Sequence, residues 1–323
     1  DGKTKVCGVY GNPVEHTKSP AIHNTLAAIK GINLVYVPLP VERDRVEDAV
    51  YLKRKYKACM NRELSLEKPV TFNEKLQWLK LHDRKPEYTG MVDKYEVKQY
   101  VAQKLGGEYV IPTLGVWDRF DDIDFDSLPD QFVLKCTHDS GGLVIVKDKS
   151  RLDIPAARRK LENCLKQNYF YTGREWPYRN VKPRILAEAY LSELNGLNDY
   201  KFYCFSGEVK LMLMVQGRGT PHVTGDHFDE EGKPVDLQAG TFPRSANCPE
   251  LPESFVEMKR LAEVLSAGIP HVRVDLYDVA GKVYFGELTF YDGSGFDKLE
   301  PESWDRRLGD MLELSAQGGE TSW

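Results

Sequence analysis

Two acidic residues in an otherwise apolar stretch are the first sign of chemistry in this sequence. The segment VRVDLYDVAGKVYFGELTF (272–290) predicts two antiparallel strands joined by a turn near residues 280–281. With an odd-numbered loop there, Asp275 and Glu287 fall on one face of the hairpin, directly opposite or one pair diagonal. A half-buried acid without a partner is costly, so a cation is expected, and oxygen ligands beside phosphate favour Mg²⁺.

The same hairpin has two other interpretations. The pair of acids could lie on a solvent-facing side of the sheet, or Arg273 could neutralise one of them. Arg273 shares the face of Asp275, because side chains two positions apart in a strand point the same way. The metal site and the ion pair can therefore coexist.

A second group of residues is suited to phosphate. The segment FVLKCTHDSGG (132–142) places Lys135 in a run of strand formers and then a small polar loop ending in two glycines. Backbone N–H groups of such a loop can approach phosphate oxygens, and the lysine adds a positive charge. The structural alternative is a lysine that closes an edge strand, followed by an ordinary turn.

The elements that must position these residues alternate between helices and strands, which indicates an α+β fold. Thr71 and Glu74 in TFNEKLQWLKL form a capping box at the start of a helix over 71–81. Periodicity predicts the other elements: strands at 5–10, 34–38, 110–114, 132–136, 143–146, 184–188, 201–205 and 210–215, helices at 20–30, 94–105, 155–168 and 255–267, and a polar region over 217–252.

Composition limits the class of protein. A chain of 323 residues is longer than one hydrophobic core can accommodate, so we expect two or three packed units. The net charge of -5 argues against a nucleic-acid partner, and no apolar run approaches the roughly 20 residues of a membrane span. The six scattered cysteines and the absence of a secretory signal favour reduced thiols and a cytoplasmic location.

Residues 51–314 resemble the TupA-like branch of the ATP-grasp superfamily, whose members are tied to teichuronopeptide and other surface-polysaccharide synthesis. The resemblance covers about four-fifths of the chain and is carried by several strings: TFNEKLQWLKL, MVDKYEVKQYV, IPTLGVWD, FVLKCTHDSGG, REWPYRNVKPRILAEAYL, DYKFYCFSGEVK and VRVDLYDVAGKVYFGELTFYDGSGF. It implies an ATP-grasp fold of two α+β subdomains that enclose the nucleotide, and a flexible tail at 315–323.

The resemblance also implies a nucleotide site. Lys94 matches the lysine that reaches the phosphates, with an exposed helical lysine as the alternative. Lys135 matches the strand lysine beside the phosphates and adenine. The hinge strand ILAEAYL matches the segment that holds the base and ribose, although its alternation is also that of any core strand. The implied ATP-binding residues beyond the two lysines are His138, Asp139, Ser140, Gly141 and Gly142 of the loop, and Glu188, Ala189 and Leu191 of the hinge.

For the reaction itself, the resemblance implies Lys201 and Arg273 as catalytic basic residues and Asp275 and Glu287 as the Mg²⁺ ligands. Most ATP-grasp enzymes have an Asn two positions after the second acid, whereas this sequence has Thr289, whose hydroxyl can still bind a metal. The implied activity is an ADP-forming ligation of a carboxylate and an amine through an acyl-phosphate. Positioned cations stabilise the phosphate charge in both steps.

The first fifty residues differ from the rest. GVYGNPVEHTKSPAIHN and GINLVYVPLPVE resemble the opening of the substrate domain of shikimate dehydrogenase, and Thr17 and Ser19 match the hydroxyl residues that hold the shikimate carboxylate. The resemblance ends near Val50, and the catalytic Lys and Asp and the Gly-rich cofactor turn of that family are missing. Residues 1–50 are therefore interpreted as a structural cap, with docking of a cyclic acid as the alternative.

Three functions compete. The first is an ATP- and Mg²⁺-dependent ligase that joins a small-molecule or polysaccharide carboxylate, such as a sugar acid, to an amino-acid-like amine. The second is an oxidoreductase related to shikimate dehydrogenase, and the third is a non-catalytic nucleotide-binding module. The second is disfavoured because no G-x-G-x-x-G follows a strand. The first and third differ in whether Lys94, Lys135 and the two acids converge on one cleft.

ATP with Mg²⁺ is expected to raise the thermal midpoint of the protein, because a ligand that binds only the folded state stabilises it by mass action. Differential scanning fluorimetry with NADP as the matched control measures this directly. A shift with NADP and none with ATP would reverse the order of the two enzyme classes.

Overall fold

The computed structural model describes residues 5–11, 18–40, 47–191, 197–218, 220–240 and 242–314. The chain divides into two compact units, residues 1–55 and 56–323. Helix α2 (Asp48–Met60) contains both the division and the boundary predicted near residue 50. The predicted tail, 315–323, lies outside the described residues.

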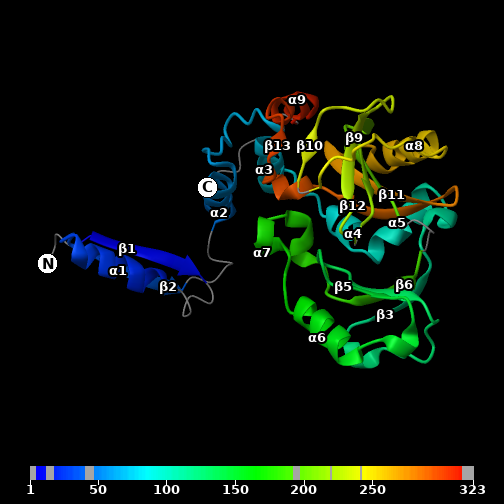
Figure 1. Cartoon of the computed structure of the whole chain (residues 1–323), viewed down its shortest axis with the longest axis horizontal. Coiled ribbons are helices and arrows are strands. Elements are labelled where there is room, and N and C mark those ends of the chain that lie inside the picture. The colour runs from blue at the N-terminus through cyan, green and yellow to red at the C-terminus, as the bar shows by residue number, and fades with distance from the viewer. Residues whose placement is uncertain are drawn as a thin grey trace. The chain divides into compact units, whose positions relative to one another are not determined.

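The first unit contains the β-α-β arrangement that the sequence predicts. Strands β1 (Lys5–Gly11) and β2 (Leu34–Pro40) pair in parallel, and helix α1 (Ser19–Ile29) connects them (Figure 1). Pro20 stands in the first turn of α1, where its missing N–H group costs nothing.

The second unit begins with helices whose ends are set by side chains. Helix α3 (Phe72–His82) has the predicted capping box, with Thr71 accepting from the Glu74 N–H group. The helix predicted at 94–105 is shorter, α5 (Glu96–Lys104), and α4 (Tyr88–Val92) precedes it. Asp93 separates the two, because its carboxylate accepts from the N–H groups of residues 95 and 96 at 2.8 and 3.2 Å.

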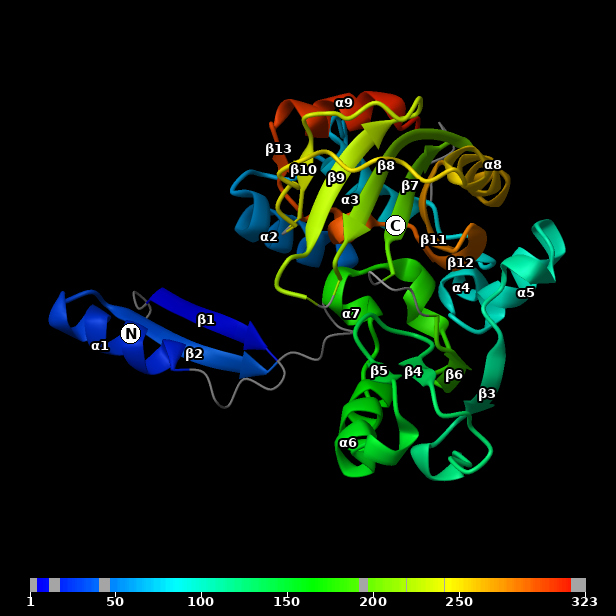
Figure 2. The same ribbon diagram turned by 45° about the vertical axis from the view of Figure 1, so that its right-hand side comes forward.

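A four-stranded antiparallel sheet follows. Its order is β3 (Thr113–Trp117), β6 (Ile185–Ala189), β4 (Phe132–Cys136) and β5 (Leu143–Val146). Helix α6 (Ile154–Leu165) packs on β4 and closes a small apolar core (Figure 2). The strand predicted at 110–114 starts later than expected, since Pro112 has no N–H group to donate to a neighbouring strand.

A five-stranded antiparallel sheet forms the larger core. Its order is β12 (Lys282–Thr289), β11 (His271–Val279), β7 (Asp199–Phe205), β8 (Glu208–Gln216) and β9 (Thr224–Asp229), and α8 (Phe255–Ser266) covers it. Strand β9 lies in the region predicted as a polar loop. Its sequence, TGDHFD, buries Asp226 and His227 and so carries no apolar alternation.

The turn between β11 and β12 corrects one detail of the predicted hairpin. The loop has two residues, Ala280 and Gly281, with φ of 51° and 82°, as a type I′ turn requires. An even loop shifts the register, and a bulge at Gly286 shifts it back, so Asp275 pairs directly with Glu287. The predicted juxtaposition of the two acids is therefore confirmed, although by turn and bulge instead of an odd loop.

The remaining elements are short. No helix in the described ranges is both long and apolar enough to cross a bilayer. The other bounds are α7 (Phe170–Gly173), α9 (Ser303–Met311), β10 (Gln238–Ala239), β13 (Leu299–Glu300) and the 3-10 turns η2 (Gly107–Tyr109), η3 (Phe120–Asp122), η4 (Lys149–Arg151), η5 (Trp176–Asn180) and η6 (Asp292–Gly295).

Removal of residues 1–50 is expected to leave the affinity for ATP within a factor of about two, because every residue assigned to the nucleotide belongs to the unit 56–323. Calorimetric titration of a soluble truncation against the full chain measures the difference. A tenfold weaker affinity in a well-folded truncation would show that the first unit takes part in nucleotide binding.

Candidate active site

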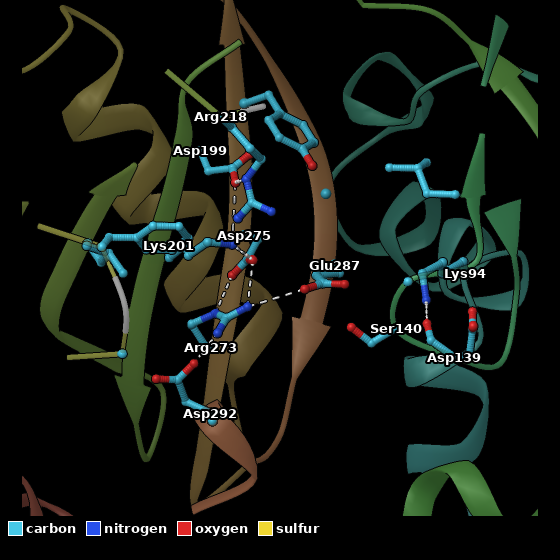
Figure 3. Close-up of a pocket in the computed structure, with 18 of the residues that line it drawn as sticks. Lys94, Asp139, Ser140, Asp199, Lys201, Arg218, Arg273, Asp275, Glu287 and Asp292 are labelled. Atoms are coloured by element: carbon cyan, nitrogen blue, oxygen red, sulfur yellow. Dashed lines mark hydrogen bonds and ion pairs between the residues drawn. The ribbon is translucent and has the colours of Figure 1, made fainter. Parts of the chain in front are cut away.

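A cavity of about 550 Å³ brings together residues from both sheets of the second unit. One side carries Lys94 and the loop 139–142, and the other carries the charged residues of β7, β11 and β12 (Figure 3). Lys135, from the strand that precedes the loop, lines the cavity as well. The predicted residues on its surface are Lys94, Lys135, Asp139, Ser140, Gly141, Gly142, Lys201, Arg273, Asp275 and Glu287. Residues more than 190 positions apart in the sequence thus meet in one place.

Arg273 is the centre of the charged side of the cavity. Its guanidinium donates to both oxygens of Asp275, at 2.7 and 2.8 Å, in the fork geometry that makes such pairs strong. It also donates to Asp292 and, at 3.2 Å, to Glu287. Lys201 pairs with Asp275 from the neighbouring strand. The ion pair that the sequence left as an alternative to the metal site is therefore present.

These contacts decide the charge of the buried acids. Burial alone raises the pKa of Asp275, but Arg273 and Lys201 outweigh it and bring that pKa to about 2. Burial alone lowers the pKa of Arg273, but the carboxylates of Asp275 and Asp292 outweigh it and raise that pKa. Burial raises the pKa of Asp199, and Lys201 and Arg218 reduce that effect. Asp275 and Arg273 are therefore both charged near neutral pH.

The opposite side of the cavity has its own buried charge group. Glu188 accepts from Lys135 and, at 2.6 Å, from Lys98. Although burial raises the pKa of Glu188, the two lysines outweigh it and lower the pKa overall. One carboxylate therefore serves two ammonium groups, and a positive charge is left in the group beside the cavity. This arrangement suits an anion such as phosphate.

Lys94 and the glycine loop are tied to one another. The Lys94 ammonium donates to the backbone carbonyl of Asp139. The backbone N–H group of Lys94 donates to the carbonyl of Thr137 at 3.0 Å. The Asp139 carboxylate accepts from the Gly142 N–H group at 3.1 Å and from the thiol of Cys164. The Cys136 thiol, burial and Asp139 together raise the pKa of Cys164.

Several predicted residues lie away from the described cavity lining. The His138 ring is buried, with Nε2 at 3.2 Å from the carbonyl of Cys164 and 3.1 Å from that of Gln167, so it fixes the loop to the end of α6. Thr289 accepts from Arg273 at 3.1 Å and lies 3.3 Å from Glu287. The three predicted hinge residues, Glu188, Ala189 and Leu191, are also not part of this lining.

Ala189 belongs to a different part of the surface. Its N–H group donates to the carbonyl of Pro112 at 3.0 Å, and with Tyr190 it lines a second, open cavity of about 620 Å³. In the first unit, Ser19 begins α1 and its Oγ lies 3.3 Å from Nδ1 of His23. Thr17 lies outside the described residues.

Sequence reasoning missed four charged residues of the cavity, Asp199, Arg218, Asp292 and Asp297. Asp199 stands two positions before Lys201 in β7 and therefore on the same face, a signal that strand alternation could have given. Arg218 pairs with Asp199 at 2.5 Å, and Asp292 accepts from Tyr203 at 2.7 Å as well as from Arg273. Neither could be placed without knowing how the loops after β8 and β12 fold.

The donor set is suited to a divalent cation. The side formed by residues 199–297 carries five carboxylates against three basic groups, so it has an excess of negative charge. Glu287 is the more accessible of the two predicted metal ligands, with 44% of its side chain exposed against 3% for Asp275. Both oxygens of Asp275 already accept from Arg273, so Asp275 must give up part of that contact to bind a metal.

Comparison with known families assigns this second unit. The model of the TupA-like ATP-grasp family matches residues 74–313, about three quarters of the chain. The chain therefore belongs to the TupA-like ATP-grasp family. This confirms the predicted ATP-grasp fold class and the prediction of an ATP-dependent ligase.

The first unit has different relatives. The shikimate dehydrogenase substrate-binding domain matches residues 9–59, which confirms the predicted resemblance. Shikimate dehydrogenase (NADP⁺) from Trichormus variabilis is 49% identical over 51 residues, 16% of this chain and 18% of that protein. The Pyrococcus furiosus enzyme is 50% identical over 44 residues, 14% of this chain and 16% of that protein. The chain spans less than a fifth of these dehydrogenases.

Among the solved structures that resemble the chain are two ligases. The D-alanine–D-alanine ligase from Bacillus anthracis has a TM-score of 0.41 at 14% identity and covers 96% of each chain. The D-cycloserine synthetase DcsG has a TM-score of 0.38 at 14% identity and covers 95% of this chain and 100% of that one. These scores are low, and the family assignment rests on the family match.

Glu188→Gln is expected to destabilise the fold by about 3 kcal/mol, because it leaves two largely buried lysine side chains without their shared carboxylate. Glu287→Gln, the same change at a half-exposed position, is expected to cost less than about 0.5 kcal/mol. Urea unfolding of the two variants gives both values. Equal losses would contradict the role of Glu188 as the anchor of the lysines.

Proposed function

We propose that this protein is an ADP-forming ligase that joins a carboxylate to an amine through an acyl-phosphate. The observation that carries the proposal is the convergence of Lys94, Lys135, the glycine loop and the Arg273 network on one cavity. A basic side that suits phosphates faces an acidic side that suits a divalent cation. Both are needed when a γ-phosphoryl group passes to a carboxylate oxygen.

The basic side holds the polyphosphate of the substrate ATP. Lys135 is fixed by Glu188, and Lys94 is fixed by the carbonyl of Asp139, so both ammonium groups are positioned before the nucleotide arrives. Ser140, Gly141 and Gly142 line the same cavity. The N–H groups of Ser140 and Gly141 can approach phosphate oxygens, whereas that of Gly142 already donates to Asp139. A covering loop also limits hydrolysis of an acyl-phosphate by water.

The acidic side holds the metal and the reacting carboxylate. Glu287 and Asp275 are the residues that would bind Mg²⁺, which supplies charge neutralisation between phosphate groups when bound. Arg273 and Lys201 hold Asp275 in place and present positive charge to the oxygens of the acyl-phosphate. In the second step the amine nitrogen attacks the acyl carbon, inorganic phosphate leaves, and the nitrogen loses a proton.

The substrates are proposed by class. Loops between β8 and α8 border the cavity through Arg218, Ala239, Gly240 and Phe242, and they mix a cation, an aromatic ring and backbone. Such a surface suits a polyhydroxylated acid, because sugar faces stack on aromatic rings while the carboxylate meets a cation. We therefore propose a sugar acid, free or in a polysaccharide, as the carboxylate and an amino-acid-like compound as the amine.

For residues 1–50 we propose a structural role. Dehydrogenase activity has no support, since the matched segment is a small part of those enzymes. Docking of a cyclic acid by Thr17 and Ser19 is the alternative. Thr17→Ala and Ser19→Ala distinguish the two, because only docking predicts a change in turnover of a cyclic acid at constant ATP affinity.

Glu287→Gln is expected to keep the fold and to reduce ADP formation at least about 100-fold, because an amide keeps the shape but loses the charge that a metal requires. A coupled ADP-release assay with uronic acids and amino acids as substrates measures the loss. Circular dichroism of the variant checks the fold.

The matched control is Glu208→Gln. Glu208 is also a strand glutamate with an exposed side chain, but it is not among the residues that line the cavity. The activity of the Glu208→Gln variant is expected to stay within a factor of about two of the activity of the unchanged protein. Retained activity in Glu287→Gln would rule out Glu287 as a metal ligand.

A further inference from the structure

Three side chains with metal-ligating atoms meet beneath the glycine loop. Cys136 ends β4, Asp139 lies in the loop, and Cys164 lies near the end of α6. Their two sulfurs and a carboxylate oxygen lie within 4.8 Å of one another, and all three residues are buried. Neither the phosphate contacts nor the carboxylate network of the cavity uses these thiols.

The Asp139 carboxylate has unused capacity. Its Oδ2 accepts from the Gly142 N–H group and from the Cys164 thiol, but its buried Oδ1 has no hydrogen-bond partner among the described residues. Within the described ranges, no lysine or arginine forms an ion pair with this carboxylate either. A buried, partly unsatisfied carboxylate is costly, and a cation is the partner that removes the cost.

The backbone closes directly on the group. A Cβ atom at Gly142 would lie 2.5 Å from the sulfur of Cys164, 2.9 Å from Oδ2 of Asp139 and 3.0 Å from Cβ of Cys136. The missing side chain at this position is what lets the loop approach the sulfurs. The polar side chains of the loop, β4 and α6 therefore meet in one small cluster at the edge of an apolar core.

We propose that Cys136, Asp139 and Cys164 form a site for a thiophilic divalent cation of the zinc class. Two sulfurs select against Mg²⁺ and Ca²⁺, which prefer oxygen, and three protein ligands leave a fourth tetrahedral position for water. Sulfurs bound tetrahedrally to Zn²⁺ lie about 3.8 Å apart, so small side-chain movements complete the site. The site is separate from the Mg²⁺ ligands and does not depend on the proposed ligase activity.

Binding exchanges protons for metal. Each thiol loses one proton to solvent as its sulfur–metal bond forms, and the hydrogen bond from Cys164 to Asp139 is replaced by two bonds to the ion. Two protons leave and a doubly charged ion enters, so the net charge beside the phosphates stays the same. The effect of the metal is to fix positions, because Asp139 also holds the Lys94 ammonium through its backbone carbonyl. An occupied site fixes the loop to β4 and α6.

Cobalt titration tests the site directly. The probe is Co²⁺, added to the full chain after chelation and under a phosphine reductant, in a background with Cys7→Ser, Cys59→Ser and Cys248→Ser. Cys59 and Cys248 are exposed and would otherwise bind metal at the surface. We expect a sulfur-to-cobalt charge-transfer band that saturates at one equivalent and is abolished by Zn²⁺.

Single variants locate the ligands. Cys164→Ser and Asp139→Asn are each expected to weaken Co²⁺ binding at least about tenfold. Cys204→Ala is the matched control, since Cys204 is buried in the other core and its loss should leave the band unchanged. Asp139→Asn keeps the shape of the side chain, so it remains informative if Cys164→Ser does not fold.

Three results would overturn the proposal. One is the absence of the charge-transfer band at one equivalent of Co²⁺ in the folded background protein. Another is a band of unchanged affinity in Cys164→Ser or Asp139→Asn. The last is a disulfide between Cys136 and Cys164, detected by thiol counting in the purified protein before reduction, with no metal binding after it. None of these outcomes depends on ATP binding or ligase activity.

Discussion

The Arg273–Asp275 ion pair is the interaction on which the acidic side of the cavity depends. A largely buried charge pair such as this one is stable only when its geometry is good and its other hydrogen bonds are made. Arg273 meets this condition by contacting three carboxylates, and Lys201 supports Asp275 from the next strand. Because the five residues come from β7, β11, β12 and the turn after β12, the network links these segments of the sheet.

The same principle operates on the basic side, with the signs reversed. There one buried acid, Glu188, holds Lys98 and Lys135 and leaves excess positive charge toward the cavity. Each sheet thus carries a charged group that is stabilised within its own core and remains incomplete at the cavity. The proposed nucleotide and its metal would complement both groups.

Much of this could be predicted from the sequence. The capping box at Thr71 and the strands of FVLKCTHDSGG follow from local propensity. The juxtaposition of Asp275 and Glu287 was predicted from strand alternation across an odd loop, whereas the structure reaches it through a two-residue turn and a bulge. The bulge at Gly286 could not be predicted, since a glycine in a strand indicates a bulge only when the register is known. Strand β9 was missed because its buried residues other than Phe228 are a glycine and two polar residues, which follow no apolar period.

The side-chain partners were harder to predict than the elements. Nothing local in the sequence indicates that Glu188 binds two lysines, or that Asp292 reaches Arg273 from the turn after β12, because these contacts join distant segments. The same holds for Cys136 and Cys164, which are 28 positions apart and meet only when α6 packs on β4. Family resemblance supplied the candidate site residues, and the structure gave their side-chain partners.

The central claim is that both sides of the cavity contact one bound nucleotide. Hydrogen exchange measured by mass spectrometry, with and without ATP and Mg²⁺, tests it most directly, because backbone amides that a ligand covers or orders exchange more slowly. The account predicts slower exchange in two separate segments, residues 135–145 and residues 271–292, in the same titration. Slower exchange in only one of them, or only in residues 1–50, would contradict it.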